Sequence, residues 1–157
     1  MKRPYEEISA KLHFTGDRTQ RMRTLVDALW EGLSGHGVSW VGFYLHEDAD
    51  ELVLGPMRNK PACSPIGMHG ACGRAFREQR PLIVRDVADL GANYVACDPR
   101  DKSELVIPLL DRDGTCWGVL DFDSHDVGAF RPEDLRAVWD FLCRAELTAG
   151  ECAEPIT

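Results

Sequence analysis

Residues 103–123 have the sequence Ser103-Glu-Leu-Val-Ile-Pro-Leu-Leu-Asp-Arg-Asp-Gly-Thr-Cys-Trp-Gly-Val-Leu-Asp-Phe-Asp123. The apolar run at 105–110 predicts a buried strand, and an Asp-Gly pair between two apolar runs is a strong signal for a β-hairpin. On the returning strand Asp121 and Asp123 share one face, because successive side chains point to opposite faces. Burying two unpartnered carboxylates is costly, so that face is either exposed or lines a site. Glu104, on the neighbouring strand, would bring a third acid to it.

A cysteine lies shortly before this hairpin, in the dipeptide Cys97-Asp98. Pro99 keeps the chain out of a helix there, so we expect the cysteine in a polar turn near the strand that Glu104 opens. Reactive groups are often presented on loops that a rigid element supports, which makes Cys97 a candidate nucleophile. On their own, these residues favour the plainer interpretation, an inert loop cysteine and a surface glutamate.

A second strand, 38–46, sorts its side chains onto two faces. One face is apolar and suited to packing against a helix; it carries Val41, Phe43 and Leu45. The other face carries Trp40 and Tyr44 with Gly42 between them, a shape that could wall a small pocket. Two aromatic residues in the core explain the same pattern equally well.

The remaining patterns predict a mixture of helices and strands. Apolar residues recur at three- and four-residue steps in segments 19–33 and 132–147, which is typical of helices with one buried stripe. Residues 56–70 are rich in proline and glycine and predict a long loop that turns into a helix at 71–78. Short strands are expected at 51–55 and 82–84.

Two more cysteines lie in and after this long loop. Cys72 falls near the start of the predicted helix, where unpaired amide groups and the helix dipole would favour its thiolate. Cys63, His69, Cys72 and Cys97 could instead be four metal ligands. Their spacing matches no compact zinc motif, so we expect no metal.

Length and composition limit the classes of protein to consider. The 157 residues suit a single domain, 1–157, with its core at about 19–148 and a frayed tail after it. A formal charge of −8 argues against nucleic-acid binding. No apolar run approaches membrane-spanning length, and no signal-peptide apolar region follows the first residues. The six cysteines lack the close spacing of a secreted disulfide scaffold, so we expect a cytoplasmic protein.

Seven short segments carry a family resemblance. They are Ser39-Trp-Val-Gly-Phe-Tyr-Leu45, Leu52-Val-Leu-Gly-Pro56, Lys60-Pro-Ala-Cys63, Gly70-Ala-Cys-Gly73, Ala96-Cys-Asp98, Ser103-Glu-Leu-Val-Ile-Pro108 and Gly118-Val-Leu-Asp-Phe-Asp-Ser124. Together they resemble the free methionine-(R)-sulfoxide reductases, which have the GAF fold. The resemblance implies an α+β, GAF-like fold: an α/β sandwich whose central antiparallel sheet has helices packed on one face and a pocket under loops on the other.

The resemblance also implies roles for the acids and aromatic residues. Glu104 and Asp123 are the candidate proton donors to the sulfoxide oxygen. Asp121 would raise their pKa by like-charge repulsion or hold the substrate ammonium. Trp40 and Tyr44 correspond to the aromatics around the substrate methyl group.

The implied reaction reduces free L-methionine-(R)-sulfoxide to L-methionine. Cys97 corresponds to the catalytic cysteine, which forms a sulfenic acid, and Cys63 or Cys72 would then close an intramolecular disulfide. A thioredoxin-like reductant would reopen it, no cofactor is implied, and a homodimer is compatible with the resemblance. The alternative is a non-catalytic GAF module that binds a ligand or senses redox state. Three cysteines and three acids matching together favour the enzyme.

Overall fold

The computed structural model describes residues 2–93 and 97–157. Within them, one antiparallel sheet of six strands has the order β3-β2-β1-β6-β5-β4. The strands are β1 (Trp40–Asp48), β2 (Glu51–Arg58), β3 (Ile66–Gly67), β4 (Leu82–Val84), β5 (Ser103–Leu110) and β6 (Cys116–Ser124). The hairpin expected from the Asp113-Gly114 turn is formed by β5 and β6, and β6 lies beside β1 in the middle of the sheet.

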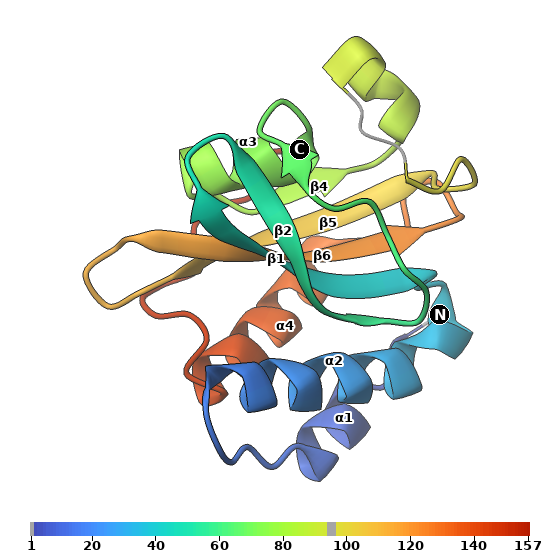
Figure 1. The fold of residues 1–157 in the computed structure, drawn as a ribbon. Coiled ribbons are helices and arrows are strands. Elements are labelled where there is room, and N and C mark those ends of the chain that lie inside the picture. Colours follow the sequence, from blue (N-terminus) through green and yellow to red (C-terminus); the bar gives the residue numbers. More distant parts are fainter. Residues whose placement is uncertain (1, 94–96) are drawn as a thin grey trace.

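Helices cover the two faces of the sheet differently (Figure 1). Helices α1 (Tyr5–Lys11), α2 (Arg18–Leu33) and α4 (Pro132–Arg144) pack on one face and enclose the larger core with it. Helix α3 (Ala71–Glu78) lies on the opposite face, after the long loop that follows β2. Short 3-10 turns form at η1 (Ser34–His36) and η2 (Val87–Asn93). The expected α+β sandwich is therefore confirmed, with α3 as an addition to the face under the loops.

The predicted two-faced strand is confirmed by the way β1 is buried. Val41 and Phe43 lie in the core under α2 and α4, whereas Trp40 and Tyr44 lie in a smaller cluster on the α3 side. Gly42, between the two aromatics, leaves room for a ring: a Cβ there would lie 2.3 Å from Cη2 of Trp40. Because Gly42 has no side chain, the Trp40 indole can occupy the space next to it on the same strand.

Helix ends differ slightly from the pattern-based bounds, for identifiable reasons. Helix α2 begins one residue earlier than expected, because Asp17 and Gln20 form a reciprocal capping box at its start. Helix α4 ends at Arg144 rather than near Leu147, since Glu146 has a positive φ of 54° and the Leu147 amide bonds back to Leu142. Helix α1 has no counterpart in the predictions; it is seven residues long and buries only Ile8.

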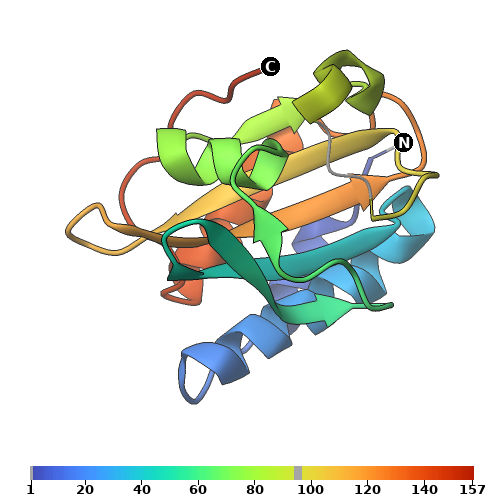
Figure 2. The same ribbon diagram turned by 45° about the horizontal axis from the view of Figure 1, so that its top comes forward.

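The end of the described chain, expected as a frayed tail, makes backbone contacts with the sheet. Ile156 pairs with β4 in parallel, accepting from the Ile83 amide and donating to the Pro81 carbonyl, each at 2.8 Å. The chain after α4 thus returns across the molecule to the β4 edge (Figure 2). No helix in the described part of the chain is both long and apolar enough to cross a bilayer.

Candidate active site

Three neighbouring strands position the acids and aromatics singled out from the sequence, helix α3 positions Cys72, and Cys63 and Cys97 lie in loops. In the sheet register, Asp123 lies opposite Glu104 on one side and opposite Trp40 on the other. Asp121 lies one step further along the same face and opposite Gly42. The predicted convergence of the three acids is therefore built by the pairing of β5, β6 and β1.

These side chains line one cavity of about 40 Å³ between the sheet and α3. Seven of the eight residues singled out from the sequence border it: Trp40, Tyr44, Cys72, Cys97, Glu104, Asp121 and Asp123. A wider pocket of about 270 Å³ adjoins it and shares Trp40, Cys97 and Asp123. Cys97 therefore lies on the wall that the two pockets share.

The eighth residue, Cys63, is joined to Cys97 by a disulfide with a Cα–Cα distance of 5.6 Å. This lies within the roughly 7 Å that a disulfide can span. Both cysteines are exposed at the mouth of the cavity, whereas Cys72 is a free, buried thiol. In this state the Cys63 and Cys97 sulfurs cannot act as thiolate ligands, so the alternative set of four zinc ligands is not assembled. Ala96, part of the Ala96-Cys-Asp98 motif, lies outside the described residues.

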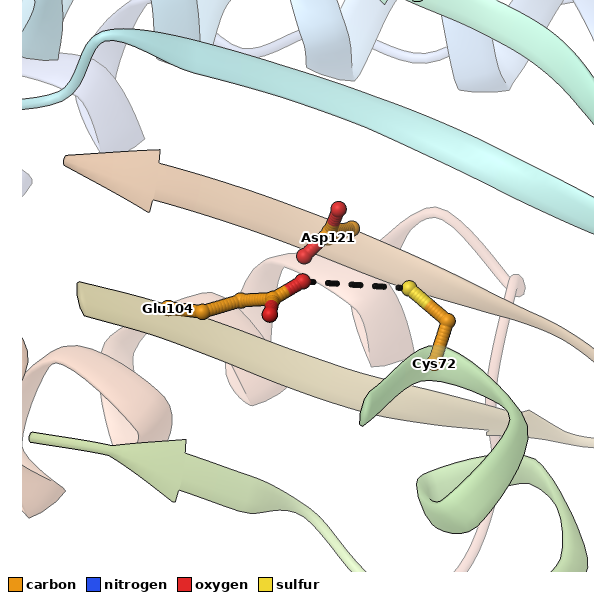
Figure 3. A group of neighbouring side chains, drawn as sticks. All are labelled: Cys72, Glu104 and Asp121. Atoms are coloured by element: carbon orange, nitrogen blue, oxygen red, sulfur yellow. Dashed lines mark hydrogen bonds between the residues drawn. The ribbon is translucent and has the colours of Figure 1, made fainter. Parts of the chain in front are cut away.

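Cys72, Glu104 and Asp121 form the inner cluster of the site (Figure 3). The Cys72 thiol donates to Glu104 Oε2 over 3.9 Å, and one ligand-type atom from each residue lies within 4.8 Å of the others. One Asp121 oxygen, Oδ1, is buried with no hydrogen-bond partner among the described residues. Such a group could bind a cation, and it could equally hold protons.

Burial favours the protonated form of these carboxyl groups. It raises the pKa of Glu104, and burial followed by the charge of Asp123 raises the pKa of Asp121 well above its ordinary value. Burial followed by the charge of Glu104 does the same to the pKa of Asp123. Crowding and burial thus shift all three carboxyl groups toward the protonated form, which is what a proton donor to a leaving oxygen requires.

The prediction of a stabilised thiolate at Cys72 is wrong. Cys72 is the second residue of α3, as expected, but burial and then Asp121 raise the pKa of its thiol well above the ordinary value. A helix terminus offers only a partial charge, and here complete burial beside acids outweighs it. Cys72 therefore stays a neutral thiol.

The two aromatics have a structural task that the sequence did not reveal. The Trp40 indole Nε1 donates to the Lys60 carbonyl over 3.0 Å, and the Tyr44 hydroxyl donates to the Cys63 carbonyl over 2.8 Å. The segment that carries Cys63 is thus fastened at two points to β1.

Sequence reasoning also missed the charged residues at the mouth. Lys60 pairs with Asp98 at 2.6 Å. Asp101 borders the inner cavity, and burial followed by the charge of Asp98 raises its pKa to about 6. His125 lies 3.5 Å from Asp98 and 3.7 Å from Asp101, a grouping that could also accept a cation. Lys60 and Asp98 stand three residues and one residue from the disulfide cysteines, and this spacing was the available signal.

Comparisons with known proteins find a family and curated relatives. A family model described as the GAF domain matches residues 15–142. The chain is 39% identical over 111 residues to the free methionine-R-sulfoxide reductase of Escherichia coli, covering 69% of this chain and 65% of that protein. It is 42% identical over 104 residues to GAF domain-containing protein A of Dictyostelium discoideum, covering 66% of this chain and 65% of that protein.

A solved structure is similar over most of the chain. The free methionine-R-sulfoxide reductase from Neisseria meningitidis, in complex with its substrate, has a TM-score of 0.78 and 32% identity, covering 90% of this chain and 83% of that one. By contrast, the matched region spans only 65% of the length of each of the two curated relatives.

Proposed function

The chain belongs to the GAF domain family, and we propose that it reduces free L-methionine-(R)-sulfoxide to L-methionine. One observation carries the proposal: a single cavity joins three acids of raised pKa to a cysteine, Cys97, that is able to form a disulfide. Reduction of a sulfoxide requires these two groups together, a thiolate to attack sulfur and an acid to protonate oxygen.

In the first step the Cys97 thiolate attacks the sulfoxide sulfur while Glu104 or Asp123 supplies a proton to the oxygen. The oxygen passes to the Cys97 sulfur, so the products are methionine and the sulfenic acid Cys97–SOH. Methionine sulfur is reduced by two electrons, and the cysteine sulfur is oxidised by two. Trp40 and Tyr44 would flank the substrate methyl group.

Asp121 is suited to hold the substrate ammonium, because its Oδ1 is buried without a partner in the described structure. A buried polar atom gains most from a charged donor. A residue inside a peptide has no free ammonium, so this contact would favour the free amino acid.

In the second step the Cys63 thiol condenses with Cys97–SOH, giving the Cys63–Cys97 disulfide and water. Both cysteines are exposed, which would let a thioredoxin-like dithiol restore them by exchange. Cys72 borders the same cavity and remains a second candidate partner for Cys97. Its buried, neutral thiol makes it the slower nucleophile of the two.

Turnover of the free (R)-sulfoxide with dithiothreitol, followed as released methionine, tests the proposal. We expect activity in the wild type and in Cys116→Ala, whose buried thiol lies outside the cavity, and none in Cys97→Ser. Substantial turnover by Cys97→Ser would contradict the assignment of the nucleophile.

A non-catalytic ligand-binding or redox-sensing module remains the alternative, and the name of the Dictyostelium relative, GAF domain-containing protein A, is consistent with it. Binding of the sulfoxide to reduced protein with no release of methionine would favour that function.

A further inference from the structure

Two loops meet over the cavity. The first, called here the Cys63 loop, is residues 59–65, and the second, the Cys97 loop, is residues 97–101. In the described structure two bonds join them: the disulfide, and the ion pair between Lys60 Nζ and Asp98 Oδ2 at 2.6 Å. When the disulfide is reduced, the ion pair is the bond that still spans from one loop to the other.

Each loop is anchored to a different part of the sheet. The Cys63 loop is hydrogen-bonded to β1, because its Lys60 and Cys63 carbonyls accept from Trp40 and Tyr44. The Cys97 loop is fixed just beyond its last residue, where the Lys102 amide donates to the Ser124 carbonyl of β6 over 2.8 Å. These anchors hold each loop to its own part of the sheet, and none of them joins one loop to the other.

The ion pair is suited to set that distance. Asp98 is adjacent to Cys97, and its side chain is only 14% exposed, whereas Lys60 is 40% exposed. Hydrogen bonds from Arg100, and then from Lys60, hold the pKa of Asp98 far below its ordinary value, so the carboxylate stays charged. Arg100 lies in the same loop as Asp98, and His125 follows β6. Of these three partners of Asp98, only Lys60 comes from the Cys63 loop.

We propose that Lys60 is a positioning residue, which pairs with Asp98 to hold Cys63 within reach of Cys97 for disulfide formation. The inference rests on the proposed function for its place in the cycle. The step that it assists is Cys97–SOH + HS–Cys63 → Cys97–S–S–Cys63 + H₂O. The Lys60–Asp98 ion pair is strongest when the two loops are close together, so it favours formation of the disulfide. By linkage, the disulfide favours the ion pair in turn.

A thiol–disulfide equilibrium tests the inference without the substrate. Purified protein is equilibrated with mixtures of reduced and oxidised dithiothreitol, and the Cys63–Cys97 disulfide is quantified by peptide mapping. Because partly exposed ion pairs contribute at most about fivefold to an equilibrium constant, Lys60→Gln should favour the dithiol form by about two- to fivefold. The upper value corresponds to a reduction potential about 20 mV less negative.

Matched variants separate positioning from a general loss of charge or stability. Lys60→Arg keeps the cation and should behave as the wild type. Arg100→Gln removes a cation that pairs with Asp98 from within the Cys97 loop and does not join the two loops. The thiol–disulfide equilibrium of this variant should therefore equal that of the wild type. In about 1 M salt, where charges are screened beyond roughly 3 Å, the difference between wild type and Lys60→Gln should shrink.

A single-turnover experiment places the effect in the cycle. With reduced protein and one equivalent of sulfoxide, Lys60→Gln should release methionine at the wild-type rate but form the disulfide about two- to fivefold more slowly. If the wild type releases no methionine, the proposed function fails while the dithiothreitol equilibrium still tests the ion pair. Lys60→Gln equal to wild type in the equilibrium, or Arg100→Gln shifted as far as Lys60→Gln, overturns the inference.

Discussion

Asp121→Asn is expected to make the stability of the folded protein less sensitive to rising pH. Ligand-type atoms of Glu104 and Asp121 lie within 4.8 Å of each other, so two full charges there would repel by about 3.5 kcal/mol at an effective dielectric constant of 20. The wild type escapes part of this energy by keeping a proton in the cluster. The substitution can therefore return only part of the full repulsion between the two charges.

The direction follows from the raised pKa of Asp121. Burial, and then Asp123, raise it in the folded protein above the value of about 3.9 expected for an unfolded aspartate. The neutral carboxyl gives its full stability below that unfolded value, and the stability is lost as pH rises toward the folded pKa. Asparagine does not titrate, so the variant should lose less stability than the wild type as the pH rises above about 4.

The assay is urea unfolding of the disulfide form at several pH values, with and without the substitution. Asp113→Asn is a suitable control, because Asp113 is an exposed turn residue whose pKa is lowered by the Thr115 amide. Replacing the Asp113 carboxylate should leave the loss of stability with rising pH unchanged. If the free energy of unfolding depends on pH equally in wild type and Asp121→Asn, the proposal that the buried acids of the folded protein hold a proton is refuted.

Three further outcomes are expected. Glu104→Gln and Asp123→Asn should each lower kcat by about 10²–10⁴-fold, and the double variant should lose less than the product, since both act on one proton transfer. Gly73→Ala would place a Cβ 2.1 Å from a backbone oxygen of the preceding loop, and overpacking of this kind costs about 1–3 kcal/mol in urea unfolding. Gly35→Ala, with open space around it, is its neutral control. Tyr44→Phe should lower stability by about 1 kcal/mol, by loss of the hydrogen bond that fastens the Cys63 loop.

Periodicity predicted the parts of the fold that repeat locally. Alternation along β1 separated Trp40 and Tyr44 from Val41 and Phe43, and the Asp113-Gly114 turn fixed the pairing that brings Glu104 opposite Asp123. Both inferences depend on neighbours in the sequence, where side-chain direction follows from strand geometry alone.

What the sequence could not supply depends on contacts between distant segments. The state of Cys72 was misjudged because a helix start is visible in the sequence, whereas enclosure by two acid-bearing strands is not. The choice of Cys63 over Cys72 as the disulfide partner, and the pairing of Lys60 with Asp98, depend on how two separate loops meet. The family resemblance supplied the candidate reacting residues, and tertiary structure was needed to show how they are held.

The return of the chain to β4 also bears on how the molecule avoids self-association. An exposed strand edge offers unpaired amide and carbonyl groups on which another chain can align and begin to aggregate. Pairing with Ile156 occupies part of the outer edge of β4, and the opposite edge of the sheet is β3, only two residues long. Removing the residues after Gly150 would leave Leu82, Ile83 and Val84 along an open edge. Such a truncated chain should form intermolecular sheet more readily during heating, even if its cavity and cysteines are unchanged.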